Sequence, residues 1–474
     1  MEGTTENAIY RPGCNDLPNE LLWRIFRHLG HTDLLQMSLV CRRWNQTIFH
    51  FLNDRFRFRP ERCDDLHEHR TFKHLDLSAC PLPLPTLNIK WRDYFFEDKT
   101  QLERQNGSHV RSITVKTAAS HQDLLVRLLV TFKSLEKLDW FVSGKMLSYY
   151  KVTIGTRRMI NASMAPVKHL KINAKMYKLQ NVLENLSESL VTLDVVLSPQ
   201  TLINICGNKN SFPNLETLKV EIDAGDELLL EGSMKEFLET LPKLRKFSFH
   251  MSDPEAVQEV TDADTNIEEF ELFGLVDYYV PDMSDMKNLK TFRTDGKMVH
   301  FYMDGSTLPM PQITTLDINH VIFVDIDALV EHFPNLTTLR MALQPETNND
   351  MLALVNSYPN LEHLAIRIQG PSFSTKLMLI SSKLTKLVEL HANLVNPDGP
   401  ENFQAQAIAK FYFQGNFIIF GCVLACLPNL RKFCITTDLI RDDTCPLASI
   451  DFPEMHAYDY CQVFVNGVLI NQQV

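Results

Sequence analysis

One short phrase recurs along most of the chain and restricts its fold more than any other feature. It consists of an apolar residue, Pro-Asn-Leu, two further residues, and then two apolar residues separated by one position. The clearest copies are 212–220, 241–249 (with Lys in place of Asn), 333–341, 358–366 and 427–435. Weaker copies keep only the apolar skeleton and centre on residues 138, 170, 193, 270, 292, 316 and 390. From residue 138 to residue 390, successive centres are separated by 22–32 residues, so we predict an array of similar units rather than an ordinary α/β domain.

Each unit is predicted to contain one short strand and one helix. Leu218 and Val220 lie two positions apart, so they point to one side of a strand, and Lys219 points to the other. The segments 234–241 and 351–358 before the prolines are typical of helices, which proline then ends. No single unit can bury its own apolar side, so the units must stack into a curved array with parallel strands inside and helices outside. The spacing matches that of leucine-rich repeats, and the predicted fold class is therefore an α/β solenoid.

The repeat weakens near its ends and at two wider gaps. We expect flanking copies at Leu75/Leu77, Ile113/Val115, Phe433/Ile435 and, most weakly, Tyr458/Tyr460. The segments near 81–108 and 396–427 are each either an irregular repeat or an insertion. The second is expected to contain an extended outer helix, because its many apolar residues require burial.

The N-terminal residues predict three short helices. The first spans 16–29, with Pro18 in its first turn and Gly30 after its end. The second follows Thr32, and the third continues towards Ile48. Their apolar residues recur at helical spacing: Leu21, Leu22, Ile25, Phe26, Leu29, Leu34, Leu35, Leu39, Val40, Trp44 and Ile48. A module this small and this apolar is expected to use part of that surface for a partner.

The same residues resemble the F-box motif at nearly every defining position. The resemblance lies in Leu17-Pro18-x-Glu20-Leu21-Leu22-x-x-Ile25-Phe26-x-x-Leu29, then Asp33-Leu34, then Leu39-Val40-Cys41-Arg42-x-Trp44. An F-box followed by leucine-rich repeats is similar to the F-box/LRR class of substrate receptors. This resemblance implies that the first module binds a Skp-family adaptor, which joins it to the cullin and RING subunits of an SCF-type E3 ubiquitin ligase. The repeats would then hold a protein substrate.

The resemblance also implies domain boundaries and adaptor-binding residues. The expected domains are the F-box at 13–57, a connector at 58–70 that includes part of the basic run 55–59, the repeats at 71–462 and a C-terminal tail at 463–474. The residues expected to contact the adaptor or support that contact are Leu17, Pro18, Leu21, Ile25, Leu34, Val40 and Trp44. Phe26, Leu29 and Leu39 are expected only to pack the three helices together.

The inner strand face is the expected substrate surface. The residues between the paired apolar positions are Asp139, Lys171, Asp194, Lys219, Ser248, Glu271, Arg293, Asp317, Arg340, Ala365 and His391. We predict that seven of them bind substrate: Asp139, Lys171, Lys219, Glu271, Arg293, Asp317 and Arg340. Charges of both signs alternate along this series, which favours a protein surface over a nucleic-acid backbone.

Composition disfavours several other kinds of protein. The formal charge is −11, so nucleic-acid binding is not expected. The longest apolar run, 417–427, is too short to cross a membrane. The polar N-terminus and ten scattered cysteines predict a reducing compartment, the cytoplasm and/or the nucleus. Cys422 and Cys426 are expected in the core.

No motif predicts an enzyme or a cofactor. A Gly-rich phosphate loop, His-Glu-x-x-His and paired Cys-x-x-Cys are all absent from the sequence. Cys63, His67 and His69 are close enough in sequence to bind zinc but lack an evident fourth ligand, so no metal site is predicted. Two alternatives to a ligase subunit stay open: a scaffold that holds the adaptor alone, and a small-molecule sensor whose repeats enclose a ligand.

Overall fold

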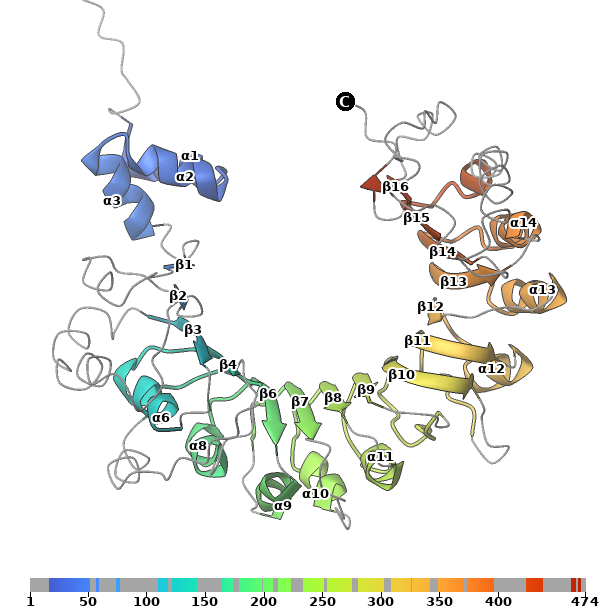
Figure 1. Cartoon of the computed structure of the whole chain (residues 1–474), viewed down its shortest axis with the longest axis horizontal. Coiled ribbons are helices and arrows are strands. Elements are labelled where there is room, and N and C mark those ends of the chain that lie inside the picture. Colours follow the sequence, from blue (N-terminus) through green and yellow to red (C-terminus); the bar gives the residue numbers. More distant parts are fainter. Residues whose placement is uncertain are drawn as a thin grey trace, which may run out of the picture. The chain divides into compact units, whose positions relative to one another are not determined.

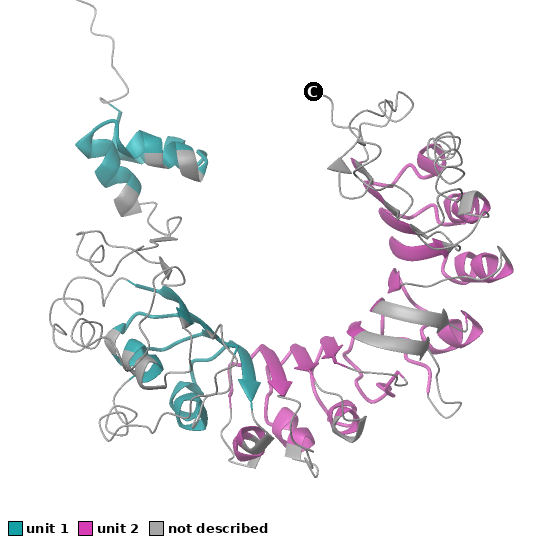
Figure 2. Ribbon diagram, in the orientation of Figure 1, with its two compact units in different colours: residues 1–197 teal, residues 198–474 magenta. Residues whose placement is uncertain are grey.

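The structure is a computed structural model, and it divides the chain into two compact units, residues 1–197 and 198–474 (Figure 2). The residues that it describes are 17–51, 57–58, 74–76, 110–117, 122–142, 164–173, 179–197, 199–207, 212–222, 233–250, 254–274, 280–301, 308–324, 326–341, 348–369, 373–395, 423–437, 462–465 and 468–469. Helices and parallel strands are present in both units, so the chain has a mixed α/β fold.

The first unit begins with the three predicted helices, α1 (Asn19–Phe26), α2 (His31–Ser38) and α3 (Arg42–Phe51). Pro18 directly precedes α1, where its missing N–H removes no helical hydrogen bond. Helix α3 packs against both of the other helices. The core between them consists of Leu22, Phe26, Leu34 and Ile48, all of which are buried.

The first unit continues with a set of parallel strands. They are β1 (Arg57–Phe58), β2 (His74–Asp76), β3 (Ser112–Thr117), β4 (Lys137–Val142), β5 (His169–Ile172) and β6 (Thr192–Leu197), each paired with the next. Two described helices accompany them, α6 (Gln122–Thr131) and α8 (Leu179–Leu186). The predicted flanking copies at Leu75 and Ile113 are confirmed as strands β2 and β3.

The second unit repeats the same arrangement. Its strands are β7 (Thr217–Ile222), β8 (Lys246–His250), β9 (Glu269–Phe273), β10 (Thr291–Phe301), β11 (Thr315–Val324), β12 (Thr338–Met341), β13 (His363–Gln369), β14 (Glu389–Val395), β15 (Lys432–Thr437), β16 (Gln462–Val465) and β17 (Val468–Leu469). Its longer helices are α9 (Pro199–Gly207), α10 (Ser233–Glu239), α11 (Pro254–Thr261), α12 (Ile326–His332), α13 (Asn348–Ser357) and α14 (Phe373–Lys383). The helices between strands, α6 and α8 in the first unit and α9 to α14 in the second, lie along one side of the strands of their unit (Figure 1).

The predicted apolar centres are in register within each unit. In the second unit, the residues that lie opposite one another on successive strands are Leu218, Phe247, Phe270, Phe292, Leu316, Leu339, Leu364, Leu390, Phe433 and Val463. The centres from Leu218 to Phe433 are all buried, and three of them form a run of neighbouring rings. The Phe247 and Phe270 centroids are 5.9 Å apart, and those of Phe270 and Phe292 are 5.8 Å apart. The alternation therefore gives each strand one face in the core and one open face.

The asparagine of the repeated phrase links one strand-helix repeat to the repeat that precedes it. The side-chain amide of Asn335 donates a hydrogen bond to the carbonyl of Pro311 at 2.9 Å. Asn429 donates in the same way to Thr385 at 3.1 Å. These acceptors are carbonyls at the turn between helix and strand, where no sheet partner is available. The Pro-Asn-Leu phrase thus ends a helix and joins consecutive turns.

The structure corrects two expectations, at Tyr458/Tyr460 and Cys426, and leaves the domain boundaries as predictions. The strand beside β15 is β16, with Val463 opposite Phe433, so the weak copy at Tyr458/Tyr460 was wrong. β16 pairs with β17 as an antiparallel hairpin, within the segment that we expected to be a tail. Strand pairing starts at Arg57, at the edge of the segment that we expected to be a connector. Cys426 is exposed rather than in the core.

Several expectations fall outside the described residues. They concern the irregular segment 81–108, residues 396–422 of the predicted outer helix, the possible zinc ligands Cys63, His67 and His69, and Cys422. Residues 423–426, at the end of the second irregular segment, form a short helical turn.

Candidate binding surfaces

The N-terminal helices leave large apolar side chains exposed beside a closed core. Leu21 and Ile25 are 44 % and 49 % exposed, and they lie one helical turn apart on α1, on a single face. Leu39 and Val40, directly after α2, are 83 % and 58 % exposed. Apolar exposure of this extent on so small a module is typical of a partner-binding surface.

The seven predicted adaptor residues separate into two groups. Pro18, Leu21, Ile25 and Val40 are exposed, whereas Leu17, Leu34 and Trp44 pack into or against the core. The expectation that Phe26 and Leu29 pack the helices together is confirmed. The same expectation for Leu39 was wrong, because that side chain is the most exposed of the large apolar residues described.

Arg43 is a residue that the sequence pattern did not identify. Its Nε donates to Asn19 Oδ1 at 3.0 Å, and its Nη2 donates to the carbonyl of Leu17. These two bonds join α3 to the start of α1. The neighbouring Trp44 meets the Phe26 ring edge-on, with centroids 5.2 Å apart. Contacts from Arg43 and Trp44 of α3 therefore fix the position of α1, which carries the exposed residues.

In the first unit, the open face of the strands carries three of the predicted polar residues. Asp139, Lys171 and Asp194 lie opposite one another on β4, β5 and β6. Lys171 Nζ is 2.6 Å from Asp194 Oδ2, and Lys137 Nζ is 3.3 Å from Asp139 Oδ2. The charges on this face are therefore paired across and along the strands.

In the second unit, the residues predicted on the inner strand face form one continuous row. Lys219, Ser248, Glu271, Arg293, Asp317, Arg340, Ala365 and His391 occupy consecutive strands in register. The strand register therefore places these positions next to one another. Their role in substrate contact stays a prediction.

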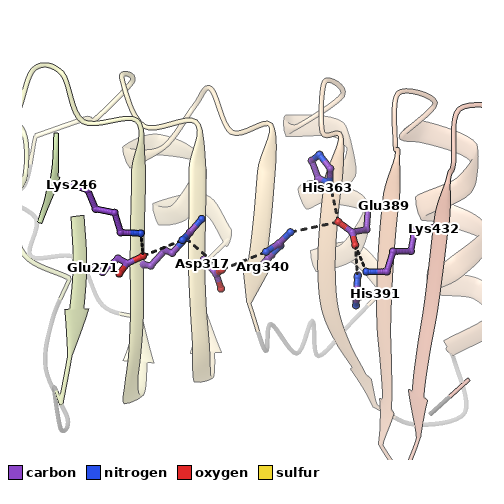
Figure 3. A network of polar contacts seen from close by, with 9 residues as sticks. Lys246, Glu271, Asp317, Arg340, His363, Glu389, His391 and Lys432 are labelled. Carbon is purple, nitrogen blue, oxygen red and sulfur yellow. Dashed lines mark hydrogen bonds and ion pairs between the residues drawn. The ribbon is translucent and has the colours of Figure 1, made fainter. Parts of the chain in front are cut away.

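Glu271 on β9 is the most deeply buried acid of this row, with 9 % of its surface exposed. Its carboxylate accepts a hydrogen bond from Lys246 Nζ at 2.7 Å (Figure 3). It also accepts hydrogen bonds from Ser248 Oγ at 2.6 Å and Arg293 Nη1 at 3.1 Å. Burial alone would raise its pKa, but the hydrogen bonds from Lys246 and Ser248 outweigh burial, so the pKa is lowered. Glu271 therefore stays ionised and holds Lys246 and Arg293 in place.

For Asp317 on β11, burial has a larger effect on the pKa than the neighbouring positive charges. Arg293 Nε lies 4.0 Å and Arg340 Nη1 lies 3.8 Å from Asp317 Oδ2, too far for hydrogen bonds. Burial raises the pKa of Asp317, and the two arginines offset burial only in part. This carboxylate is the least compensated acid in the row.

Glu389 on β14 joins the end of the network to three more strands. Its carboxylate lies 2.8 Å from Lys432 Nζ, 2.9 Å from His391 Nε2, 3.2 Å from His363 Nδ1 and 3.5 Å from Arg340 Nη2 (Figure 3). Burial works to raise the pKa of Glu389, but the hydrogen bonds from Lys432 and the histidines prevail and lower it to about 2. The result is a chain of ion pairs from β8 to β15.

Sequence reasoning missed Lys246, His363, Glu389 and Lys432, although a signal for them was present. Each lies two positions before a residue of the predicted row or its continuation, and strand alternation places such residues on the same face. The sequence analysis considered only the position between the two apolar residues of each strand. It therefore identified only part of the network.

A hollow of about 310 Å³ opens on this face where the row passes Ala365. Its lining residues are Asp317, Ile318, Arg340, Met341, Ala365, Ile366, Arg367, His391, Ala392 and Asn393. Ala365 lies between Arg340 and His391 in register and contributes only a methyl group. The space that a longer side chain would fill is therefore open.

Two other kinds of site are absent from the described part of the chain. No group of three or more His, Cys, Asp or Glu side chains there could hold a metal ion. Among the same residues, no helix combines the length and the apolar character that a membrane span requires. The polar network on the open face therefore contains no cluster suited to binding a metal.

A family model described as F-box-like matches residues 14–58. No curated protein matches the chain. The match spans the three N-terminal helices and their exposed apolar residues, and it ends at Phe58, within the first strand. It supports membership of the first module in the F-box family and leaves the strand-helix units without a matched family.

Proposed function

We propose that the chain is the substrate-recognition subunit of an SCF-type E3 ubiquitin ligase. One observation carries this proposal: the F-box-like match at 14–58 coincides with a small helical module that exposes Leu21, Ile25, Leu39 and Val40. F-box domains bind Skp-family adaptors in SCF complexes. In this proposal the chain performs no catalysis, and the adaptor connects it to the cullin and RING subunits.

The exposed residues supply a physical reason for adaptor binding. Burying apolar surface contributes about 25 cal/mol per Å² removed from water. Leu21 and Ile25 present such surface on a helix that Arg43 and the Leu22–Phe26 core already hold in place. A preorganised apolar face loses little conformational freedom on binding, which favours affinity. Pro18 and Val40 extend the proposed contact, and Leu17, Leu34 and Trp44 support it from below.

The strand-helix units form the second half of the proposal. Their spacing and register support a leucine-rich-repeat solenoid from about residue 71, and the open face would receive a protein substrate. The mixed charges of Glu271, Arg293, Asp317 and Arg340 suit a protein surface, because alternating signs favour one partner and register over others. We also propose substrate contacts for Lys219 in the second unit and, separately, for Asp139 and Lys171 in the first unit. The proposed compartment is the cytoplasm and/or the nucleus.

The adaptor contact is tested by placing a charge on the exposed face of α1. We expect Leu21→Asp and Ile25→Asp to weaken binding of a purified Skp-family adaptor at least about tenfold, since a carboxylate would be buried without a partner. Both side chains are about half exposed, so the helices should keep their circular dichroism spectrum. Gln46→Asp on α3 adds the same charge at an exposed position and serves as the matched control. Unchanged adaptor binding by both α1 variants would refute the proposal that this face of α1 contacts the adaptor.

A further inference from the structure

The hollow beside Ala365 lies where strands β13 and β14 run side by side. Both strands continue past the residues of the row, β13 to Gln369 and β14 to Val395. Arg367 and Asn393 lie directly opposite each other on these extensions. Arg367 lies two positions after Ala365, and Asn393 lies two positions after His391. Both are therefore on the same open face as that row. The hollow thus has Arg340 on one side and the Arg367–Asn393 pair on the other.

The two arginines of the hollow, Arg340 and Arg367, differ in the polar partners that they already have. Arg340 is shared between Asp317, at 3.8 Å, and Glu389, at 3.5 Å. The Arg367 Nε is buried and has no hydrogen-bond partner among the residues that the structure describes. A buried guanidinium N–H without an acceptor lowers stability unless another group supplies one. Arg367 lines the hollow, and its unsatisfied Nε shows that the described residues do not fill the hydrogen-bonding capacity of its guanidinium group.

We propose that this hollow binds a carboxylate of the protein substrate, with Arg367 as the principal donor and Arg340 and Asn393 beside it. This inference rests on the proposed function and adds the chemical class that the open face recognises. Guanidinium groups match carboxylates because their planar N–H donors can form two parallel bonds. The space of about 310 Å³ accommodates an acidic side chain.

The charge of the lining selects a carboxylate over a phosphate. The lining contains two arginines and one aspartate, which gives a formal charge of +1 with His391 neutral. A single carboxylate neutralises this charge, whereas a phosphate dianion would leave excess negative charge next to Asp317. The nearby Glu389 does not cancel Arg367, because its carboxylate is already engaged by Lys432 and the two histidines.

The test compares three pools of synthetic peptides on the immobilised full-length protein. The pools have random flanking residues and a fixed central glutamate, glutamine or phosphoserine. We expect the glutamate pool to be retained about tenfold more than the glutamine pool, the effect of one charge-assisted hydrogen-bonded pair. Arg367→Gln should abolish the preference by removing the donor, and Ala365→Leu should abolish it by filling the hollow without changing charge.

The matched control is Arg245→Gln. It removes the same charge from a side chain that is 72 % exposed and does not line the hollow, so the preference for glutamate should persist. Equal retention of the glutamate and glutamine pools would overturn the inference, as would stronger retention of phosphoserine or an unaltered preference in Arg367→Gln. Thermal melting of each variant checks that it is folded.

Adaptor binding measured on the same preparations separates this inference from the proposed function. If the unaltered protein binds the Skp-family adaptor but shows no preference for glutamate, only the carboxylate site fails. If the unaltered protein does not bind the adaptor, the proposed function fails, whatever the peptide pools show.

Discussion

At the scale of single residues, Glu389 shows how one side chain can join several strands. Its carboxylate contacts Arg340 on β12, His363 on β13, His391 on β14 and Lys432 on β15. Hydrogen bonds from Lys432 and the two histidines outweigh burial and lower the pKa of this carboxyl to about 2. The carboxylate therefore stabilises the open face only in its ionised form, and that stabilisation must depend on pH.

The first prediction concerns Glu389→Gln. The folded pKa lies below the unfolded value, so the carboxylate's contribution is complete above about pH 4.5 and is lost as the pH falls towards 2. The full shift would correspond to roughly 3 kcal/mol, and screening by solvent makes the actual stabilisation smaller than this. We expect Glu389→Gln to unfold at lower urea concentration at pH 7 and to approach the unaltered protein at low pH. A difference in urea midpoint that stays constant down to pH 2 would contradict this account.

Gly274 supports a second prediction. Its φ is +82°, and an added Cβ would lie 2.6 Å from the His250 ring. We expect Gly274→Ala to lower stability by about 1–2 kcal/mol from the backbone alone, with a steric contribution in addition. His250→Ala should recover only the steric part in the double variant, as measured by urea unfolding. Full recovery would show that the backbone conformation at Gly274 is not restrictive.

At the scale of helices and strands, the sequence predicted the elements well wherever an apolar pair followed a proline. Strand alternation and the Pro-Asn-Leu turn depend only on neighbouring residues in the sequence. A single strand-helix repeat can therefore be recognised from its own sequence, without a related protein for comparison. Tyr458 and Tyr460 misled because two aromatics one residue apart imitate the pattern, whereas Val463 and Val465 form the strand in register. Leu39 misled for a related reason: helical spacing indicates which side chains are apolar but not which of them the neighbouring helices cover.

The third prediction tests the link between turns. Asn335→Ala removes the hydrogen bond to the Pro311 carbonyl, and we expect a loss of about 1 kcal/mol in urea unfolding. Glu331→Ala changes an exposed side chain on α12 of the same unit and should have a smaller effect. If both variants unfold at the same urea concentration as the unaltered protein, the asparagine is not needed to join consecutive turns.

At the scale of the whole molecule, the sequence predicted an F-box-like module and a series of strand-helix units but not how the open face is used. The residues of the central row could be predicted because their position follows from alternation alone. The hollow could not, because it depends on the small size of Ala365 and on the pairing of β13 with β14, which places Arg367 beside Asn393. These features appear only once neighbouring strands are in register.

The most direct test of the central claim is the mass of the complex that the full-length protein forms with purified adaptor, cullin and RING subunits. We expect a single assembly that contains all four, and we expect the Leu21→Asp and Ile25→Asp variants to be excluded from it. An assembly with adaptor alone, under conditions in which the same adaptor binds cullin, would contradict a ligase subunit and indicate an adaptor-bound scaffold.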